Sequence, residues 1–351
     1  MGRIFKAVFG VVLALVGTFV YQYWNQFVFF GRFYLSMPYK DPFAPLHLFN
    51  AAVESIPDEQ KSRLVVLSVM AKMGTTWVSH IAYQLLSRGK AVNGSMPLMH
   101  ELPYPEFAEG QRGVPLHELD PPFWQEDIFS KYPEGPIIVR THVSLDHLRE
   151  SGGAGGDDGY RVITVLRDIE PVCRSAYKMM IGIVGMEESE LNFDDFLSLM
   201  SLFPFTENIL RHFAAVWETR HDPNVLVLFF DDMIQDLSGS VRAVADQLEL
   251  SPPATEEELE LVTSQSSKKA MSAPEWKRRF SSMAGMEHMF PFAKESPELV
   301  ASSRSKVSFS EKWKKHFDDQ WMKIVFPRTN CTSYSDMRAK FHREREALQK
   351  E

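Results

Sequence analysis

Short, almost wholly apolar runs alternate with longer stretches of helical periodicity through most of the chain. Turn residues bound four of these runs, which predict buried strands at 64–69, 136–139, 160–166 and 225–230. Helical patterns follow at 75–87, from Pro171 onward, and at 193–221, 236–248 and 255–263. Because strands that alternate with helices form a mainly parallel sheet covered by helices, the pattern predicts an α/β fold.

The first 32 residues form a separate apolar segment. No charged residue occurs between Ala7 and Gly31, and the part up to Val20 is almost entirely aliphatic. A bilayer is crossed by roughly 20 residues, and the aromatic residues at the end of this segment are typical of a membrane interface. The segment is therefore predicted to be an uncleaved signal anchor that forms a transmembrane helix, with a cleaved signal peptide as the alternative.

The rest of the chain divides into a Pro-containing neck at 33–60, one main domain at 61–332 and a charged helical tail at 333–351. We expect the tail to be a solvated face. Two sequons, Asn93-Gly94-Ser95 and Asn330-Cys331-Thr332, favour a lumenal glycoprotein. The expected location is therefore the Golgi or ER membrane, with the main domain in the lumen.

Composition narrows the possible function classes. The 351 residues carry a formal net charge of -8, which argues against a general nucleic-acid binder because such proteins are normally basic. The only cysteines are Cys173 and Cys331, so a disulfide framework is excluded and a single disulfide is left open. No cluster of cysteine, histidine or carboxylate residues has the spacing of a metal site, and we predict no metal.

The segment after the first predicted strand has the chemistry of an anion site. It reads, in order, Lys72, Met73, Gly74, Thr75, Thr76 and Trp77. A glycine lets the backbone approach a ligand closely, and the first N–H groups of the following helix have no internal partner. Together with the helix dipole, the hydroxyls and the Lys72 ammonium, they suit a phosphate. An ordinary strand–turn–helix is the simpler alternative, and the Walker A pattern is not matched because Lys72 precedes the only glycine.

Polar residues follow all four predicted strands. Lys72, His142, Arg167 and Asp231 each stand at or just beyond a carboxyl end, and ligands of parallel α/β sheets bind at that edge. Lys72 and Arg167 are cations that suit phosphates, whereas His142 is a candidate general base. Ser175 is expected on the opening turn of the next helix, where a second anion could be held. Taken alone, His142 is more simply explained as a hydrogen-bonded structural residue.

Six motifs, in chain order, resemble those of the cytosolic-type sulfotransferases, which use 3′-phosphoadenosine 5′-phosphosulfate (PAPS) as the sulfuryl donor. The P-K-S-G-T-T-W loop and the K-T-H motif of that family are matched by Ala71–Trp77 and Arg140–His142. The Arg and Ser that bind the 3′-phosphate in the family are matched by Arg167 and Ser175. The L-F-Y-E-D-M, T-S-F-x-x-M and W-K-x-H-F segments resemble Leu228–Met233, Ser266–Met271 and Trp313–Phe317.

The resemblance implies a P-loop-NTPase-like parallel β-sheet flanked by helices, and in-line transfer of a sulfuryl group. His142 would be the general base, and Lys72 would neutralise charge on the bridging oxygen. The residues that would bind PAPS are Lys72, Met73, Gly74, Thr75, Thr76, Trp77, Arg167, Ser175, Ser267, Arg304 and Lys306. No metal is implied.

The chain departs from the family pattern at several of these positions. The second 3′-phosphate loop of the family is R-K-G-x-x-G-x-W, and counting back from Trp313 places Lys306, Val307 and Ser308 on R-K-G. Lys306 keeps a charge without the forked geometry of arginine, and Arg304 is a nearby substitute. The dimerisation signature of the family is not preserved, so the oligomeric state is left open.

Two other functions are compatible with parts of the pattern. A P-loop kinase would use Asp231 or Asp232 to hold Mg²⁺, and a membrane-anchored binding protein would keep the fold without the reaction. For a sulfotransferase, the acceptor could be a small molecule, a lipid or a glycan. Aromatic residues between 97 and 135 are expected to contribute an apolar acceptor pocket, with simple packing as the alternative.

Overall fold

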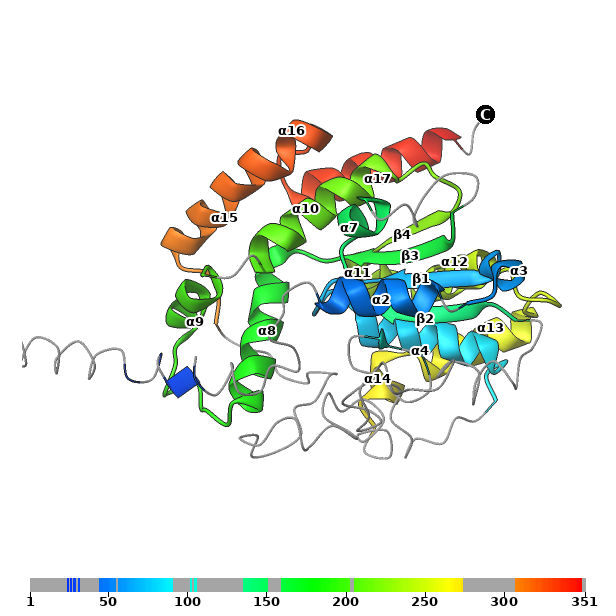
Figure 1. Cartoon of the computed structure of the whole chain (residues 1–351), viewed down its shortest axis with the longest axis horizontal. Coiled ribbons are helices and arrows are strands. Elements are labelled where there is room, and N and C mark those ends of the chain that lie inside the picture. The colour runs from blue at the N-terminus through cyan, green and yellow to red at the C-terminus, as the bar shows by residue number, and fades with distance from the viewer. Residues whose placement is uncertain are drawn as a thin grey trace, which may run out of the picture.

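A computed structural model describes the chain at residues 24, 26, 28, 29, 31, 44–54, 56–90, 102, 104, 105, 135–150, 159–202, 205–273 and 307–348. Its centre is a sheet of four parallel strands in the order β2-β1-β3-β4 (Figure 1). The strands are β1 (Leu64–Ser68), β2 (Ile137–Thr141), β3 (Arg161–Leu166) and β4 (Val225–Phe229). All four predicted strands are therefore present, and the predicted α/β class with a parallel sheet is confirmed.

Helices connect and surround the strands. They are α2 (Ala44–Glu54), α3 (Asp58–Lys61), α4 (Thr75–Leu86), α7 (Leu145–Glu150), α8 (Ile169–Ile183), α9 (Phe193–Met200), α10 (Phe205–Glu218), α11 (Phe230–Gln235), α12 (Leu237–Leu248), α13 (Glu256–Gln265), α14 (Lys268–Met271), α15 (Glu311–Ile324), α16 (Phe326–Thr329) and α17 (Tyr334–Leu348). Helices α4, α12 and α13 pack together on one face of the sheet, while α10 packs with α7, α15 and α16 on the other (Figure 1).

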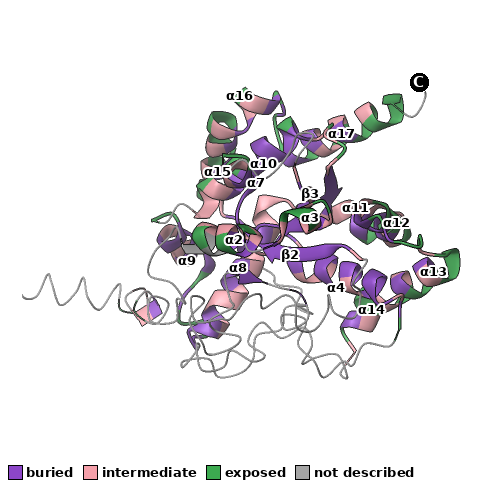
Figure 2. Cartoon of the chain, turned by 45° about the vertical axis from the view of Figure 1, so that its right-hand side comes forward, coloured by how far each residue is buried: buried purple, intermediate pink, exposed green. Residues whose placement is uncertain are grey.

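The register of the strands places their carboxyl ends at one edge. Ser68 at the end of β1 is opposite Thr141 of β2, and Leu166 at the end of β3 is opposite Phe229 of β4. Nearly every strand residue is buried, as expected for a parallel sheet covered on both faces (Figure 2). The loops after all four strands therefore emerge from the same edge, where the sequence places its candidate site residues.

A second apolar core lies where α8, α9 and α15 meet. Phe29 is buried in this core, and its ring packs edge-to-face on Phe196 of α9 with the centroids 5.9 Å apart. The aromatic side chain that the sequence assigned to a membrane interface is thus covered by protein. Most of the predicted anchor at 1–32 lies outside the described residues.

The predicted location is wrong. Among the described residues, no helix combines the length and the apolar character that crossing a bilayer requires. The prediction of a single-pass Golgi or ER protein with a lumenal domain depended on such a helix. Of the two sequons, Asn93 lies outside the described residues, whereas Asn330 is exposed just after α16.

The charged C-terminal segment forms helix α17, and one of its faces is buried. Tyr334, Met337 and Phe341 belong to the main apolar core. The structure thus differs from the expected solvated tail, because apolar residues recur at helical spacing among the charges. Cys331, just before this helix, and Cys173 in α8 are both free thiols.

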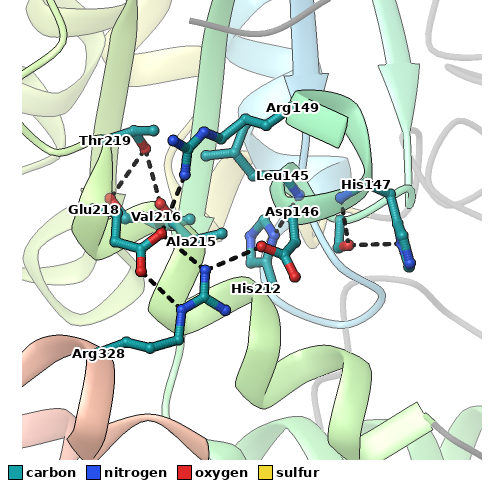
Figure 3. Close-up of polar contacts among 11 residues, drawn as sticks. Leu145, Asp146, His147, Arg149, His212, Ala215, Val216, Glu218, Thr219 and Arg328 are labelled. Atoms are coloured by element: carbon teal, nitrogen blue, oxygen red, sulfur yellow. Dashed lines mark hydrogen bonds and ion pairs between the residues drawn. The ribbon is translucent and has the colours of Figure 1, made fainter. Parts of the chain in front are cut away.

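A polar network joins the helices on the α10 side of the sheet (Figure 3). Arg328 of α16 donates to both carboxylate oxygens of Glu218 in α10 at 2.8 Å and to Asp146 in α7 at 3.1 Å. Arg149 of α7 donates to the same Glu218 at 3.1 Å. These contacts fix α7, the helix that follows the predicted catalytic histidine.

Candidate active site

The loop between β1 and α4 has a backbone that few residues can adopt. Lys72 has a φ of 68° and Gly74 a φ of 123°. A Cβ atom at Gly74 would lie 3.1 Å from the Phe230 ring and 3.5 Å from Val165, so a side chain there would also be crowded. Thr75 then begins α4, and its hydroxyl donates to the carbonyl of Val69 at 3.3 Å. The N–H groups of Thr75 and Thr76, which the α-helical pattern of α4 leaves without a partner, therefore sit at the sheet edge, as an anion cradle requires.

The positive charge of Lys72 is not balanced by a carboxylate in the described part of the chain. Its Nζ atom donates to Met179 Sδ of α8 at 3.4 Å, and no ion pair joins it to a carboxylate among the described residues. Burial, reinforced by the charge of Arg167, lowers the pKa of Lys72 to about 8. A bound anion would reverse both effects, which makes the position suited to a phosphate or sulfate group.

Arg167 lies next to this loop. Its Nη1 atom donates to the carbonyl of Lys72 at 3.0 Å, and its guanidinium covers the Phe230 ring at 4.1 Å from the centroid. Burial lowers the pKa of Arg167, and the nearby charge of Asp231 opposes that shift. The structure thus brings together the two cations that the sequence placed at separate strand ends.

His142 follows β2 and points at the same loop. Its Nδ1 atom is 2.6 Å from the carbonyl oxygen of Val69. A carbonyl only accepts, so Nδ1 carries the ring proton and the basic lone pair belongs to Nε2. Burial lowers the pKa of His142 to about 4, and the charges of Lys72 and Arg140 lower it further, against the raising effect of the Val69 hydrogen bond. The imidazole is therefore neutral at pH 7.

Trp77 links α4 to the predicted adenine segment. Its indole N–H donates to the carbonyl of Ser266 at 2.8 Å, and its ring meets Phe230 edge-to-face with the centroids 5.4 Å apart. Ser267 is the N-cap of α14, where its hydroxyl accepts from the N–H of Ala270 at 3.2 Å. The structure therefore places Trp77 beside the segment that contains Ser267.

The remaining predicted site residues lie on the same elements or outside the described part. Met73 is buried and Thr76 is half-buried in the first turn of α4. Ser175 is half-buried in the second turn of α8, which begins at Ile169, and not in the opening turn. Arg304 and Lys306 lie outside the described residues.

Several side chains at this site were not singled out from the sequence. Phe230 touches the position of Gly74, Trp77 and Arg167, and the strand-end motif that contains it was a usable signal. Tyr104 meets the His142 ring edge-to-face, with the centroids 5.3 Å apart, and Arg140 lies over the Tyr104 ring at 4.7 Å. Tyr104 comes from a stretch without periodicity, so no pattern distinguished it.

The two aspartates of the kinase alternative are engaged by α17. Asp231 accepts from the Tyr334 hydroxyl at 2.7 Å. Asp232 accepts from Arg338 at 2.7 Å and lies 2.8 Å from His342 Nε2. In the described part of the chain, no group of three or more His, Cys, Asp and Glu side chains could hold a metal ion. These contacts give both carboxylates a structural explanation that needs no Mg²⁺.

A family comparison agrees with this geometry. The sequence model of the family described as the sulfotransferase domain matches residues 62–337. The chain belongs to the sulfotransferase domain family. The match includes β1, the loop after it, the other three strands and the first residues of α17. It does not favour the kinase alternative.

Curated relatives are sulfotransferases of distant sequence. Firefly (Photinus pyralis) luciferin sulfotransferase is 32% identical over 117 residues, covering 33% of this chain and 30% of that protein. Mouse sulfotransferase 1E1 is 24% identical over 193 residues, covering 54% and 60%, respectively. Mouse sulfotransferase 1A1 is 26% identical over 273 residues, covering 76% and 85%. The chain thus spans less than two thirds of the first two relatives and most of the third.

Solved structures show the same fold. Retinol dehydratase in complex with androsterone and the inactive cofactor PAP has a TM-score of 0.53 at 17% identity, with 80% of this chain and 85% of that chain covered. The same enzyme with retinol and PAP gives a TM-score of 0.51 at 17% identity, covering 80% and 86%. The predicted P-loop-NTPase-like sheet flanked by helices is confirmed.

Proposed function

We propose that this sulfotransferase-family chain transfers a sulfuryl group from PAPS to a hydroxyl of a small organic acceptor. The bond between sulfur and the bridging oxygen of the donor breaks, and a bond between sulfur and the acceptor oxygen forms. The acceptor proton passes to His142, and 3′-phosphoadenosine 5′-phosphate (PAP) leaves. The observation that carries this proposal is the convergence of His142, Lys72 and Arg167 around one loop.

The residues after β1 fit the phosphosulfate end of the donor. Gly74, whose φ of 123° disfavours any residue with a side chain, is the N-cap of α4, and the first N–H groups of that helix would donate to the phosphosulfate oxygens. Lys72, half-buried and without a carboxylate partner among the described residues, supplies the cation that a leaving phosphate needs. Thr75, Thr76 and Trp77 would hold the 5′-phosphate and the adenine, as the motif match implies.

His142 fits the role of general base. Its tautomer is fixed by the Val69 carbonyl, so Nε2 accepts the proton of the acceptor hydroxyl. A pKa of about 4 makes the imidazole a weak base in the ligand-free protein. The charges of the donor are expected to raise it, because they offset the charge of Lys72.

We assign binding of the 3′-phosphate to Arg167 and Ser175. The motif match adds Arg304, Lys306 and Ser267 to the nucleotide site. Arg167 is half-buried and cationic beside the Lys72 backbone. A guanidinium binds phosphate through two parallel hydrogen bonds. Binding of this kind by Arg167 would favour PAPS over nucleotides without a 3′-phosphate.

The acceptor is proposed to be a small molecule with a hydroxyl group. Relatives of this chain are named for luciferin and flavonol, and retinol dehydratase was solved with retinol or androsterone. Tyr104 and Leu102 lie beside β2 and the His142 ring, where an apolar wall would orient such a molecule.

A thermal-shift titration of the full chain tests the donor. PAP, ADP, and ATP with and without Mg²⁺ are compared, with Arg167→Ala as the variant. Arg161→Ala, at the opposite end of β3, is the matched control. We expect stabilisation by PAP that is lost in Arg167→Ala and kept in Arg161→Ala. Stabilisation by Mg²⁺–ATP alone, or no shift with PAP, would reject the proposal.

A further inference from the structure

The first residue of α17 reaches the edge of the sheet where the donor is proposed to bind. The Tyr334 hydroxyl donates to Asp231 Oδ2 at 2.7 Å, and the carbonyl oxygen of Leu166 lies 3.4 Å from the same hydroxyl. Leu166 ends β3 and precedes Arg167, while Asp231 follows β4. One hydroxyl therefore joins the ends of two neighbouring strands next to the proposed 3′-phosphate residue.

The Tyr334 side chain is held in place by its ring. It is 7% exposed and packs against Phe213 and Phe229, with centroid distances of 6.0 and 5.8 Å. Burial and the Asp231 carboxylate raise the pKa of Tyr334 well above its usual range. The hydroxyl therefore keeps its proton and remains a donor to Asp231 throughout the physiological pH range.

Asp231 acts on Arg167 without pairing with it. The carboxylate charge favours the charged form of the Arg167 guanidinium. No ion pair joins these two described residues, because Arg167 donates to the Lys72 carbonyl and covers the Phe230 ring. If Asp231 lost its donor, the carboxylate would be drawn to the guanidinium and would compete with an anionic ligand for it.

Other residues of α17 also contact α11, the short helix that contains Asp231. Asp232 accepts from Arg338 Nε at 2.7 Å and lies 2.8 Å from His342 Nε2. Farther along, Glu344 accepts from Arg220 at 2.7 Å. These contacts fix the position of α17 against α11 and the turn after α10, and so hold the Tyr334 hydroxyl next to Asp231.

We propose that Tyr334 is a positioning residue for the donor site. By holding Asp231 away from Arg167, its hydroxyl keeps the guanidinium available to the 3′-phosphate of the donor. This inference rests on the proposed function, and in particular on the assignment of Arg167 to that phosphate. It gives the C-terminal helix, whose sequence indicates only a charged tail, a part in donor selection.

The variant Tyr334→Phe removes the hydroxyl and keeps the ring packing. Isothermal titration of the full chain with PAP and with adenosine 5′-phosphate measures the contribution of the 3′-phosphate as the ratio of the two Kd values. We expect PAP binding to weaken roughly tenfold, the scale of a hydrogen bond to a charged group, and adenosine 5′-phosphate binding to stay the same. Tyr160→Phe, at the other end of β3, is the control that should leave both Kd values unchanged.

The double variant Tyr334→Phe with Asp231→Asn separates positioning from simple destabilisation. If the freed carboxylate is what disables Arg167, its replacement by an amide should restore PAP binding to within about threefold of wild type. Unchanged PAP binding in Tyr334→Phe, an equal loss for both nucleotides, or failure of Asp231→Asn to rescue would overturn the inference. A wild-type chain that does not bind PAP would instead reject the proposed function on which the inference rests.

Discussion

The Nδ1 atom of His142 lies 2.6 Å from the carbonyl oxygen of Val69, one residue beyond the end of β1. The same carbonyl accepts the Thr75 hydroxyl at 3.3 Å, so one oxygen orients both the proposed base and the first helical residue of the anion loop. This shared contact links the proposed sulfuryl-acceptor side of the site, at His142, to the proposed PAPS side, at the loop before α4. A shift of the loop therefore also moves the histidine.

Replacing His142 with alanine should lower turnover roughly 10²-fold or more, the usual scale for the loss of a general base. PAP binding should persist, because Lys72 and Arg167, and not the imidazole, are the proposed contacts of the nucleotide phosphates. His147→Ala in α7 is the control. Initial rates with a responsive acceptor and a parallel PAP titration measure both quantities. Near-normal turnover in His142→Ala would remove this residue from the mechanism.

PAP affinity should fall as the pH rises through about 8. Lys72 has a lowered pKa of about 8 in the ligand-free protein, and a bound anion raises it, so binding takes up a proton above that pH. The dissociation constant should then rise by up to about tenfold per pH unit between pH 8 and 9.5. Titration calorimetry in buffers of different ionisation enthalpy detects the proton uptake.

Lys72→Arg is the control for this titration, since an arginine keeps its charge over the whole range. Its PAP affinity should vary little between pH 8 and 9.5. A wild-type affinity that is equally flat would show that the Lys72 ammonium does not contact the ligand charge.

Gly74→Ala should both destabilise the protein and weaken PAP binding. The φ of 123° is unfavourable for alanine, and the added Cβ would lie 3.1 Å from the Phe230 ring. We expect the free energy of unfolding to fall by about 1–3 kcal/mol. Urea denaturation checks this value, with Gly31→Ala as the control, because a Cβ there has nothing within 4 Å.

The fold could be predicted because its strands are continuous apolar runs and each is followed by a helical pattern. That order alone placed Lys72, His142 and Arg167 at one edge, and their contacts bear out the expected proximity. The roles of these residues remain predictions. The contribution of Tyr334 could not be predicted, because it depends on how α17 packs across β3 and β4.

The wrong prediction of a membrane location has a physical cause. The sequence shows that a side chain is apolar, but it does not show whether lipid or protein surrounds that side chain. Phe29 stands among the aromatic residues that resembled an interfacial belt, yet its ring is buried against Phe196. The opposite error concerns α17, whose many charges led us to expect a solvated helix. A few apolar residues at helical spacing are enough to bury one of its faces.

The stability of the protein should decrease as the pH falls below about 6.5, in part because of His212. This buried histidine accepts from the Leu145 N–H at 3.0 Å (Figure 3). Its Nε2 atom lies 3.1 Å from the Thr164 hydroxyl. Burial lowers its pKa from 6.5 to about 3. The unfolded chain therefore binds more protons than the folded one between these values, and stability is lost on acidification at up to about 1.4 kcal/mol per pH unit.

Urea denaturation of wild type and His212→Gln between pH 7 and 5 measures this effect. The variant should be less stable at pH 7, because its contacts with β3 and α7 are changed, but its stability should depend less steeply on pH. His142, whose pKa is lowered to about 4, contributes the same sign of dependence in both proteins. His47→Gln, at an exposed position in α2, should retain the wild-type slope. Equal slopes for wild type and His212→Gln would show that the folded state accommodates a charged imidazolium between α10 and β3.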